Sequence, residues 1–238
     1  MTPNEFIARF REAFGEATPL PIALWYSDSP IDADSRLPRC MVGAIRKVCE
    51  GQSLTISADK VQCGGGGLYA AFTSMPDRVP LFVSETEHYK RTPEMVRAYV
   101  ESMELQITDK KYLNIVRVDS LADWNEVEAL VFFATPDVLS GLCAWAFYDN
   151  NADDAVTTRF SSGCAAILSV ATVENRKGGR RCFLGLFDPS ARPLIPKYEL
   201  TFAVPMCRFR EMLQTMPDTA LFQKAYSVVR RRINGEIG

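Results

Sequence analysis

Four of the seven cysteines in this 238-residue chain stand where a helix is predicted to begin. Cys40 follows a proline and precedes a helical pattern, Cys63 stands directly before four glycines, and Cys164 follows two serines, which are typical N-cap residues. Cys207 lies in the first turn of another predicted helix. Unpaired backbone N–H groups and the helix dipole stabilise a thiolate at such a position. These four residues are therefore candidates for thiolate chemistry or for metal ligation.

The run CGGGG is the second unusual feature of the sequence. Glycine loses more backbone entropy on folding than any other residue, so four in a row predict a sharp turn or a close approach to another group. We expect either a nest of backbone N–H donors for an anion or a cluster, with at least one glycine at positive φ, or close packing of a strand against a helix. The predicted ligand-binding residues are Arg39, Gly64, Gly65, Gly66 and Gly67.

Three hypotheses follow if the helix starts converge. In the first, Cys40, Cys63 and Cys164 line a site for an iron–sulfur cluster, another metal or a small anionic ligand, and Cys207 is the only further ligand candidate. In the second, Cys63 or Cys164 is a catalytic nucleophile and the glycine N–H groups form an oxyanion hole. In the third, the chain is a cofactor-free interaction protein whose cysteines are small core residues. Spacing does not favour a metal, because metal-binding cysteines usually lie two to four residues apart and none of these do.

Other motifs are incomplete. The glycine run lacks the Lys-Ser/Thr pair of a nucleotide-binding P-loop, and His88 is the only histidine, which excludes a histidine-rich metal site. Residues 148–156 carry three aspartates but lack the glycine and distal glutamate of an EF-hand, so we interpret them as a polar loop. In FDPSARP, Asp188 and Arg192 predict an ion pair that holds a turn, although Arg192 could instead receive a carboxylate ligand.

The helices and strands that would position these residues can be predicted from the sequence. Thr-Pro-acidic helix starts occur at residues 2–5, 92–94 and 135–137, and the first predicts an amphipathic helix over about residues 3–15. Short runs rich in branched and aromatic residues predict strands at 21–26, 53–58, 112–118, 127–134, 182–187 and 199–204. Helices and strands interleave. We therefore expect an α/β or α+β fold in which helices cover a central mixed sheet.

The composition and net charge of the chain limit the kinds of partner that we expect for this protein. No linker divides the chain, so we expect one domain over residues 1–238, with the N-terminal helix packed on the main body. A net charge of -2 gives no reason to expect nucleic acid or a membrane as partner. Charged residues interrupt the N-terminus where a signal peptide would need an apolar core, and an odd number of cysteines suits reduced thiols, so we expect a cytoplasmic protein. The expected partner is a small molecule or a metal.

Several of these motifs occur together, and in this order, in one known family. They are Arg39-Cys40, CGGG, FTSMPDRVP, FFATPD with LSGL, SSGCAA, FDPSARP and VPMCRF. With them the chain resembles the prokaryotic family called domain of unknown function 169, for which no activity is established. The resemblance implies that Cys40, Cys63 and Cys164 match the family's cysteine-bearing motifs. Many relatives carry a cysteine-rich segment near the C-terminus, where this chain has only Cys207, and that departure argues against a four-cysteine cluster.

Overall fold

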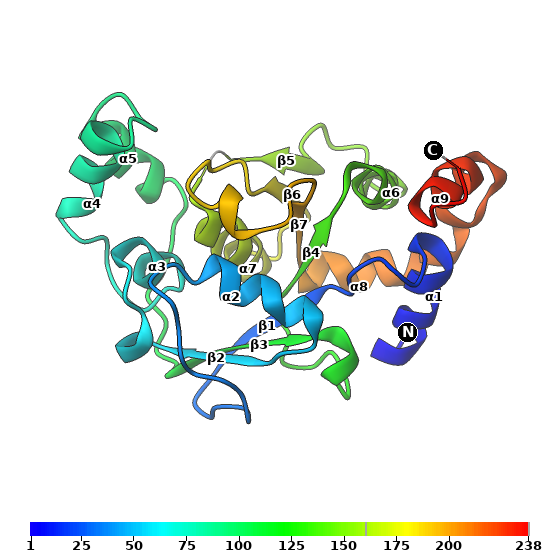
Figure 1. Ribbon diagram of the computed structural model, residues 1–238, viewed down its shortest axis with the longest axis horizontal. Coiled ribbons are helices and arrows are strands. Elements are labelled where there is room, and N and C mark those ends of the chain that lie inside the picture. Colours follow the sequence, from blue (N-terminus) through cyan, green and yellow to red (C-terminus); the bar gives the residue numbers. More distant parts are fainter. Residues whose placement is uncertain (160, 238) are drawn as a thin grey trace.

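The structure, a computed structural model, describes residues 1–159 and 161–237 and contains a seven-stranded mixed sheet. The strand order is β2-β3-β1-β4-β7-β6-β5, and all neighbours are antiparallel except β5 and β6 (Figure 1). The strands are β1 (Ile22–Ser27), β2 (Leu54–Ser57), β3 (Tyr112–Arg117), β4 (Ala129–Ala134), β5 (Val156–Thr158), β6 (Cys182–Gly185) and β7 (Leu200–Pro205). All six predicted strands are confirmed, and the fold is α+β. Only β5 was not predicted, because its three residues carry no apolar run.

The helices begin largely where local signals place them. They are α1 (Pro3–Phe14), α2 (Val42–Lys47), α3 (Gly64–Tyr69), α4 (Arg78–Leu81), α5 (Pro93–Glu101), α6 (Pro136–Phe147), α7 (Val170–Arg176), α8 (Met206–Thr215) and α9 (Ser227–Ile233). The segment η3 (Phe82–Thr86) is π-helical and directly follows α4. The segment η5 (Ala165–Ser169) is also π-helical and directly precedes α7. Thr2 and Glu5 form the capping box of α1, and Thr92 caps α5, but Thr135 makes no side-chain cap at α6.

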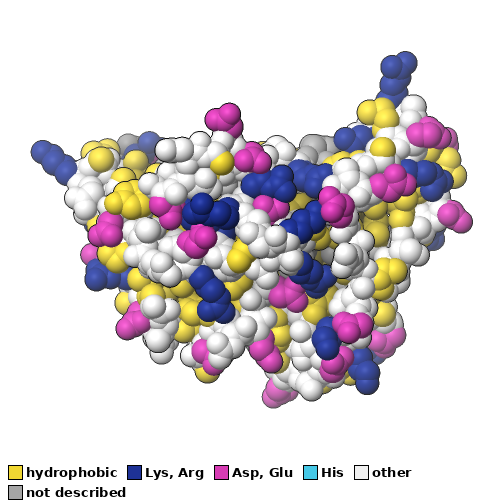
Figure 2. Space-filling view, turned by 180° about the vertical axis from the view of Figure 1, so that it is seen from behind, with side chains coloured by type: hydrophobic (Ala, Val, Ile, Leu, Met, Phe, Trp, Pro, Cys, Tyr) yellow, Lys and Arg dark blue, Asp and Glu magenta, His cyan; other side chains and the backbone are white. Residues whose placement is uncertain are grey.

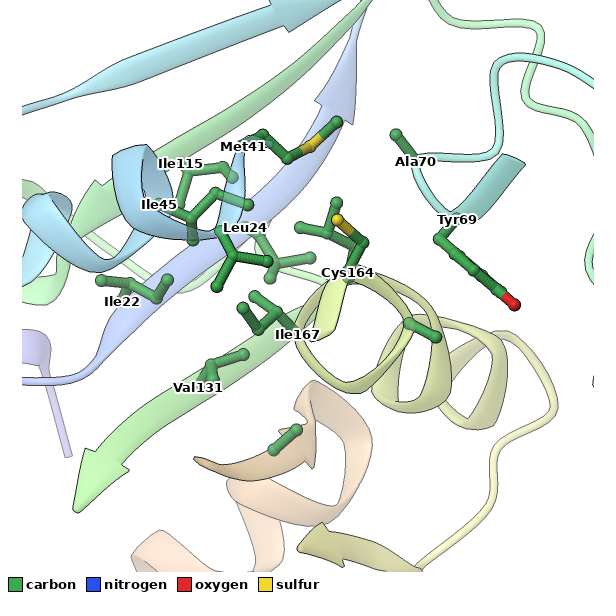
Figure 3. Close-up of a cluster of buried hydrophobic side chains, with 14 of the residues drawn as sticks. Ile22, Leu24, Met41, Ile45, Tyr69, Ala70, Ile115, Val131, Cys164 and Ile167 are labelled. Carbon is green, nitrogen blue, oxygen red and sulfur yellow. The ribbon is translucent and has the colours of Figure 1, made fainter. Parts of the chain in front are cut away.

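Helices cover both faces of the sheet. Alternate residues of β1 and β4 point to opposite faces, so that Leu24 and Val131 belong to one core cluster and Ala23 and Leu130 to the other. The first cluster includes side chains of α2, α3 and the η5–α7 helix, and Figure 3 shows part of it. The second includes α1, α6 and α8. Because β4 is buried on both faces, its whole run of six residues is apolar.

A small helical segment, residues 78–101, lies at the edge of these layers. It comprises α4, η3 and α5, which pack mainly on one another, and Figure 1 shows α4 and α5 at one end of the molecule, beyond α3. Its side chains Leu81 and Phe82 are about half exposed, at 48% and 51%. The segment forms one wall of the pocket described below.

The surface charge is mixed. Figure 2 shows, from behind, basic and acidic side chains interspersed over the face, and ion pairs such as Arg176–Glu128 (3.0 Å) and Arg180–Glu211 (2.8 Å) join residues of opposite sign. Among residues 1–159 and 161–237, no helix combines the length and the apolar character needed to cross a membrane.

Candidate functional site

Three of the predicted cysteines line one pocket with a volume of 190 Å³. Cys40 is exposed and lies two residues before α2, whereas Cys63 is half-buried and immediately precedes α3. Cys164 is buried in the first turn of the helix that continues through η5 and α7. The pocket lies between these helix starts and the segment 78–101. The fold therefore brings together thiols that are far apart in the sequence.

Cys164 differs from the expected thiolate. It is only 8% exposed, and Figure 3 shows it at the edge of the core cluster, between Met41 on one side and Tyr69 on the other. Burial raises the pKa of its thiol well above the ordinary range, and the nearby groups of Cys40, Cys63 and Asp188 raise it further. The helix start does not outweigh desolvation here. Cys164 is thus a neutral thiol in the wall of the pocket.

Four predicted site residues lie outside the pocket, and two of them, Cys207 and Arg39, lie outside the glycine run. The Cys207 sulfhydryl donates to the carbonyl of Gly179 at 3.0 Å, and its backbone N–H donates to Asn175 Oδ1 at 2.8 Å. Cys207 does begin a helix, α8, but it does not line the pocket with the other three cysteines. Arg39 is exposed and does not line it either. Within the part of the chain that the structure describes, no group of three or more His, Cys, Asp or Glu side chains is arranged to hold a metal ion.

The glycine run is helical. Residues 64–67 form the start of α3, the Gly67 N–H donates to the Cys63 carbonyl at 2.9 Å, and none of the four has positive φ, so the expectation of a left-handed glycine was wrong. A Cβ on Gly66 would lie 2.7 Å from Met41 Cε, and one on Gly67 would lie 2.9 Å from Thr73 Oγ1. Close packing thus explains these two glycines. Gly65 is different, because a Cβ there would have no neighbour nearer than 3.9 Å.

Gly65 and Gly66 nevertheless line the pocket, whereas Gly64 and Gly67 do not. A Cβ on Gly64 would come within 3.2 Å of Pro76, which again indicates packing. The predicted ligand-binding set is therefore divided: two glycines border the cavity, and the other two, with Arg39, lie beyond it.

Asp188 is a buried carboxylate in the wall of the pocket, next to the segment that carries Cys164. Its side chain is 4% exposed and accepts hydrogen bonds from the Gly163 N–H at 3.0 Å and from the N–H and hydroxyl of Ser190 at 2.9 and 2.8 Å. It thereby fastens the start of the helix that carries Cys164. The predicted ion pair with Arg192 is wrong, since the Arg192 guanidinium instead donates to the carbonyls of Lys197 and Glu199.

The pocket also contains residues that sequence reasoning missed. Tyr69 comes from α3 and Tyr99 from α5, while Glu87, Tyr89 and Lys90 come from the turn between η3 and α5. Burial is the main cause that raises the pKa of Tyr69, Tyr99 and Glu87, and the charge of Asp188 adds to the rise at Glu87. The site is thus more aromatic and more acidic than predicted.

Within the described part of the chain, two hydroxyl groups at the pocket have no hydrogen-bond partner beyond, at most, each other. Ser161 is 7% exposed, and neither its Oγ nor the buried hydroxyl of Tyr99 has a partner of acceptable geometry among the described residues. The two lie close enough for Ser161 to offset part of the rise in the Tyr99 pKa that burial causes. Most buried polar groups in proteins are satisfied, so two unsatisfied hydroxyls beside one cavity need an explanation.

The pocket residues that the sequence analysis missed belong to no recognisable sequence motif. His88 is exposed, as its charged surroundings predict, but its neighbours Glu87 and Tyr89 line the pocket. His88 has a φ of 54°, in the left-handed region, within the turn between η3 and α5.

In the polar loop at residues 148–156, Asp149 forms an ion pair with the buried Arg208, which accounts for that carboxylate.

Comparison with known proteins places this site within a family. The model of domain of unknown function 169, described as an uncharacterised ArCR family, matches residues 17–215, and the chain belongs to that family. The match spans every residue that lines the pocket, from Cys40 to Ala191. No curated protein and no solved structure shows a significant match to the chain.

Proposed function

We propose that this protein binds a small organic molecule in the cysteine pocket. The observation that carries the proposal is the Ser161 hydroxyl, which is buried at the wall of the cavity and has no hydrogen-bond partner among the described residues beyond the nearby Tyr99 hydroxyl. An unsatisfied buried hydroxyl destabilises a fold by about 1–3 kcal/mol, so a bound molecule that supplies a partner would recover this free energy. The Tyr99 hydroxyl offers a second such contact.

The size and lining of the cavity support a compact ligand. Four valines and the ring of Phe82 contribute apolar surface, and the polar groups are few. Pockets for small molecules typically combine an apolar wall with a few placed polar groups. An apolar cavity of about 150 Å³ is large enough to bind benzene. The volume of 190 Å³ therefore suits one substituted ring or an aliphatic body of similar size.

The thiols suggest a second candidate, covalent chemistry on the bound molecule. Cys63 lines the pocket and is half-buried, whereas Cys164 is buried and its pKa is raised. If the protein is an enzyme with a cysteine nucleophile, Cys63 is the residue that fits that role. An iron–sulfur cluster or other metal has less support, because Cys207 lies elsewhere and the remaining three thiols do not form a metal-binding group among the described residues.

Protection from alkylation tests the binding proposal. The protein is treated with iodoacetamide with and without benzylamine, benzyl alcohol or benzoate, and peptide mass spectrometry follows each cysteine. At least one probe should slow alkylation of Cys63 by about threefold or more at millimolar concentration. Alkylation of Cys207, which lies outside the pocket, should not change.

Two outcomes would contradict the proposal. One is that no probe protects Cys63. The other is stoichiometric iron or zinc in anaerobically purified protein that disappears in Cys63→Ser, since this would assign the thiols to a metal. Alkylation of Cys63 at least about tenfold faster than that of Cys207 would favour the nucleophile candidate.

A further inference from the structure

The pocket carries an excess of negative charge. Glu87 and Asp188 both line it, and Lys90 is the only positively charged side chain that does so among the described residues. In the same part of the chain Glu87 makes no ion pair. The Asp188 carboxylate accepts three hydrogen bonds, but all come from neutral groups of Gly163 and Ser190. Neither carboxylate therefore forms an ion pair with a basic side chain within the described residues.

Lys90 does not form an ion pair with either carboxylate among the described residues, and its ammonium group lies over the ring of Tyr99. Its ammonium nitrogen lies 5.1 Å from the centre of the Tyr99 ring, and the Arg159 guanidinium lies 5.6 Å from the same ring. Burial, followed by the charge of Asp188, raises the pKa of Glu87. The free protein thus holds Glu87 where its charge is unfavourable. A glutamate with a raised pKa beside a cavity is a candidate for a functional role, such as binding an opposite charge.

Tyrosine rings complete the electrostatic character of the pocket. Tyr69 of α3, Tyr99 of α5 and Tyr89 of the turn between η3 and α5 all line the cavity. The face of an aromatic ring attracts cations, and the two cations beside Tyr99 show that this ring already acts in that way. Aromatic faces next to uncompensated carboxylates suit an organic cation and repel an anion.

We infer that the ligand of this pocket carries a positively charged nitrogen, such as a primary amine, on a compact apolar body, with Glu87 as its main counter-charge. The inference rests on the proposed function and makes its ligand class specific. It replaces the small anionic ligand expected from the sequence, because Arg39 lies outside the pocket and the glycine run forms a packed helix. The apolar body would contact the valines and the thiol of Cys63.

Three probes that share one ring and differ in charge test the inference. Benzylamine is a cation at neutral pH, benzyl alcohol is neutral and benzoate is an anion. Their affinities are measured by the concentration dependence of Cys63 protection. Benzylamine should bind about tenfold or more tightly than benzyl alcohol, and benzoate should bind most weakly. If benzyl alcohol or benzoate binds as tightly as benzylamine, the cation assignment is wrong while binding itself stands. If no probe protects Cys63, the proposed function fails instead.

A matched pair of variants assigns the role of Glu87. Glu87→Gln keeps the shape and should reduce the preference for benzylamine over benzyl alcohol to within about threefold. Glu85→Gln changes an exposed glutamate of η3 that does not line the pocket, and it should keep the full preference. Glu87→Gln should also melt no lower than the parent, because burial disfavours the charge that it removes. A full preference retained in Glu87→Gln would overturn the assignment.

The pH dependence gives an independent measurement. Protonation of Glu87 removes its attraction for a cation, so benzylamine binding should weaken as the pH falls through the raised pKa of Glu87, above the range of an ordinary glutamate. The other titratable side chains that line the pocket are those of Asp188, Lys90, three tyrosines and three cysteines, and benzyl alcohol serves as the control for their effects on the alkylation assay. Benzyl alcohol binding should be unchanged over the same change in pH, and an equal loss for both probes would contradict the assignment.

Discussion

The two faces of the sheet differ in the side chains that cover them. On the face covered by α1, α6 and α8, aromatic rings fill the core: Phe209 contacts the rings of Phe6, Trp124, Phe132 and Trp145 at centroid distances of 5.2 to 6.4 Å. The Trp145 indole N–H donates to the Met212 carbonyl at 2.8 Å. On the opposite face, the core ends in a pocket with thiols and, within the described residues, a carboxylate without an ion pair and two hydroxyls that lack a well-formed hydrogen bond.

This difference shows where the protein gains stability and where it gives stability up. Interlocked rings stabilise the first face, where the buried Nε atoms of Arg208 and Arg230 are the polar groups left without a hydrogen-bond partner among the described residues. The second face retains features that cost free energy in the free protein, namely the hydroxyl of Ser161 and the partly buried charge of Glu87. Local departures from good packing and polar satisfaction are expected at functional sites. The comparison therefore predicts opposite effects for substitutions on the two faces.

The largest effect is expected on the aromatic face. Phe209→Ala removes a fully buried ring that four other rings contact, and it should lower the free energy of unfolding by about 3–5 kcal/mol. Urea denaturation followed by tryptophan fluorescence measures this change. In the folded variant the alkylation rate of Cys63 should stay at the parent value, because Cys63 lies on the other face. A loss below about 1 kcal/mol would show that this core is not closely packed.

A glycine pair at the pocket sharpens the comparison. A Cβ on Gly163 would lie 2.7 Å from Ala191 Cβ and 3.0 Å from Val42 Cγ2, so Gly163→Ala should lower the free energy of unfolding by about 1–3 kcal/mol. Gly65→Ala meets no such clash and replaces a helical glycine, so it should raise that free energy by up to about 1 kcal/mol. Thermal melts of both variants decide the matter. Equal destabilisation by both would mean that Gly65 is also needed for packing.

The smallest expected effects come from two buried serines. Ser169 donates to the Tyr69 carbonyl at 2.8 Å, so Ser169→Ala should lower the free energy of unfolding by about 1 kcal/mol. Ser161 has no partner, so Ser161→Ala should leave stability unchanged or raise it slightly, while weakening protection of Cys63 by benzylamine. Denaturation and the alkylation assay measure the two quantities. Ser161→Ala as destabilising as Ser169→Ala would refute the unsatisfied state of that hydroxyl.

Local signals in the sequence determined the secondary structure and the positions of the cysteines on it. The capping box of Thr2 and Glu5, the proline at the start of α5 and the apolar run of β4 each act within a few residues, so they can be recognised without the fold. For the same reason the sequence places Cys40, Cys63, Cys164 and Cys207 at or beside helix starts.

Only the tertiary structure decided which of these helix starts meet. It brought Cys40, Cys63 and Cys164 to one cavity, left Cys207 against Gly179, and surrounded the thiols with Tyr69, Tyr99 and Glu87. It also decided that burial raises the pKa of Cys164 despite its place at a helix start, and that the Met41 side chain packs closely against Gly66. The physical reason is that burial and close approach depend on contacts between residues distant in the chain, which local patterns do not specify.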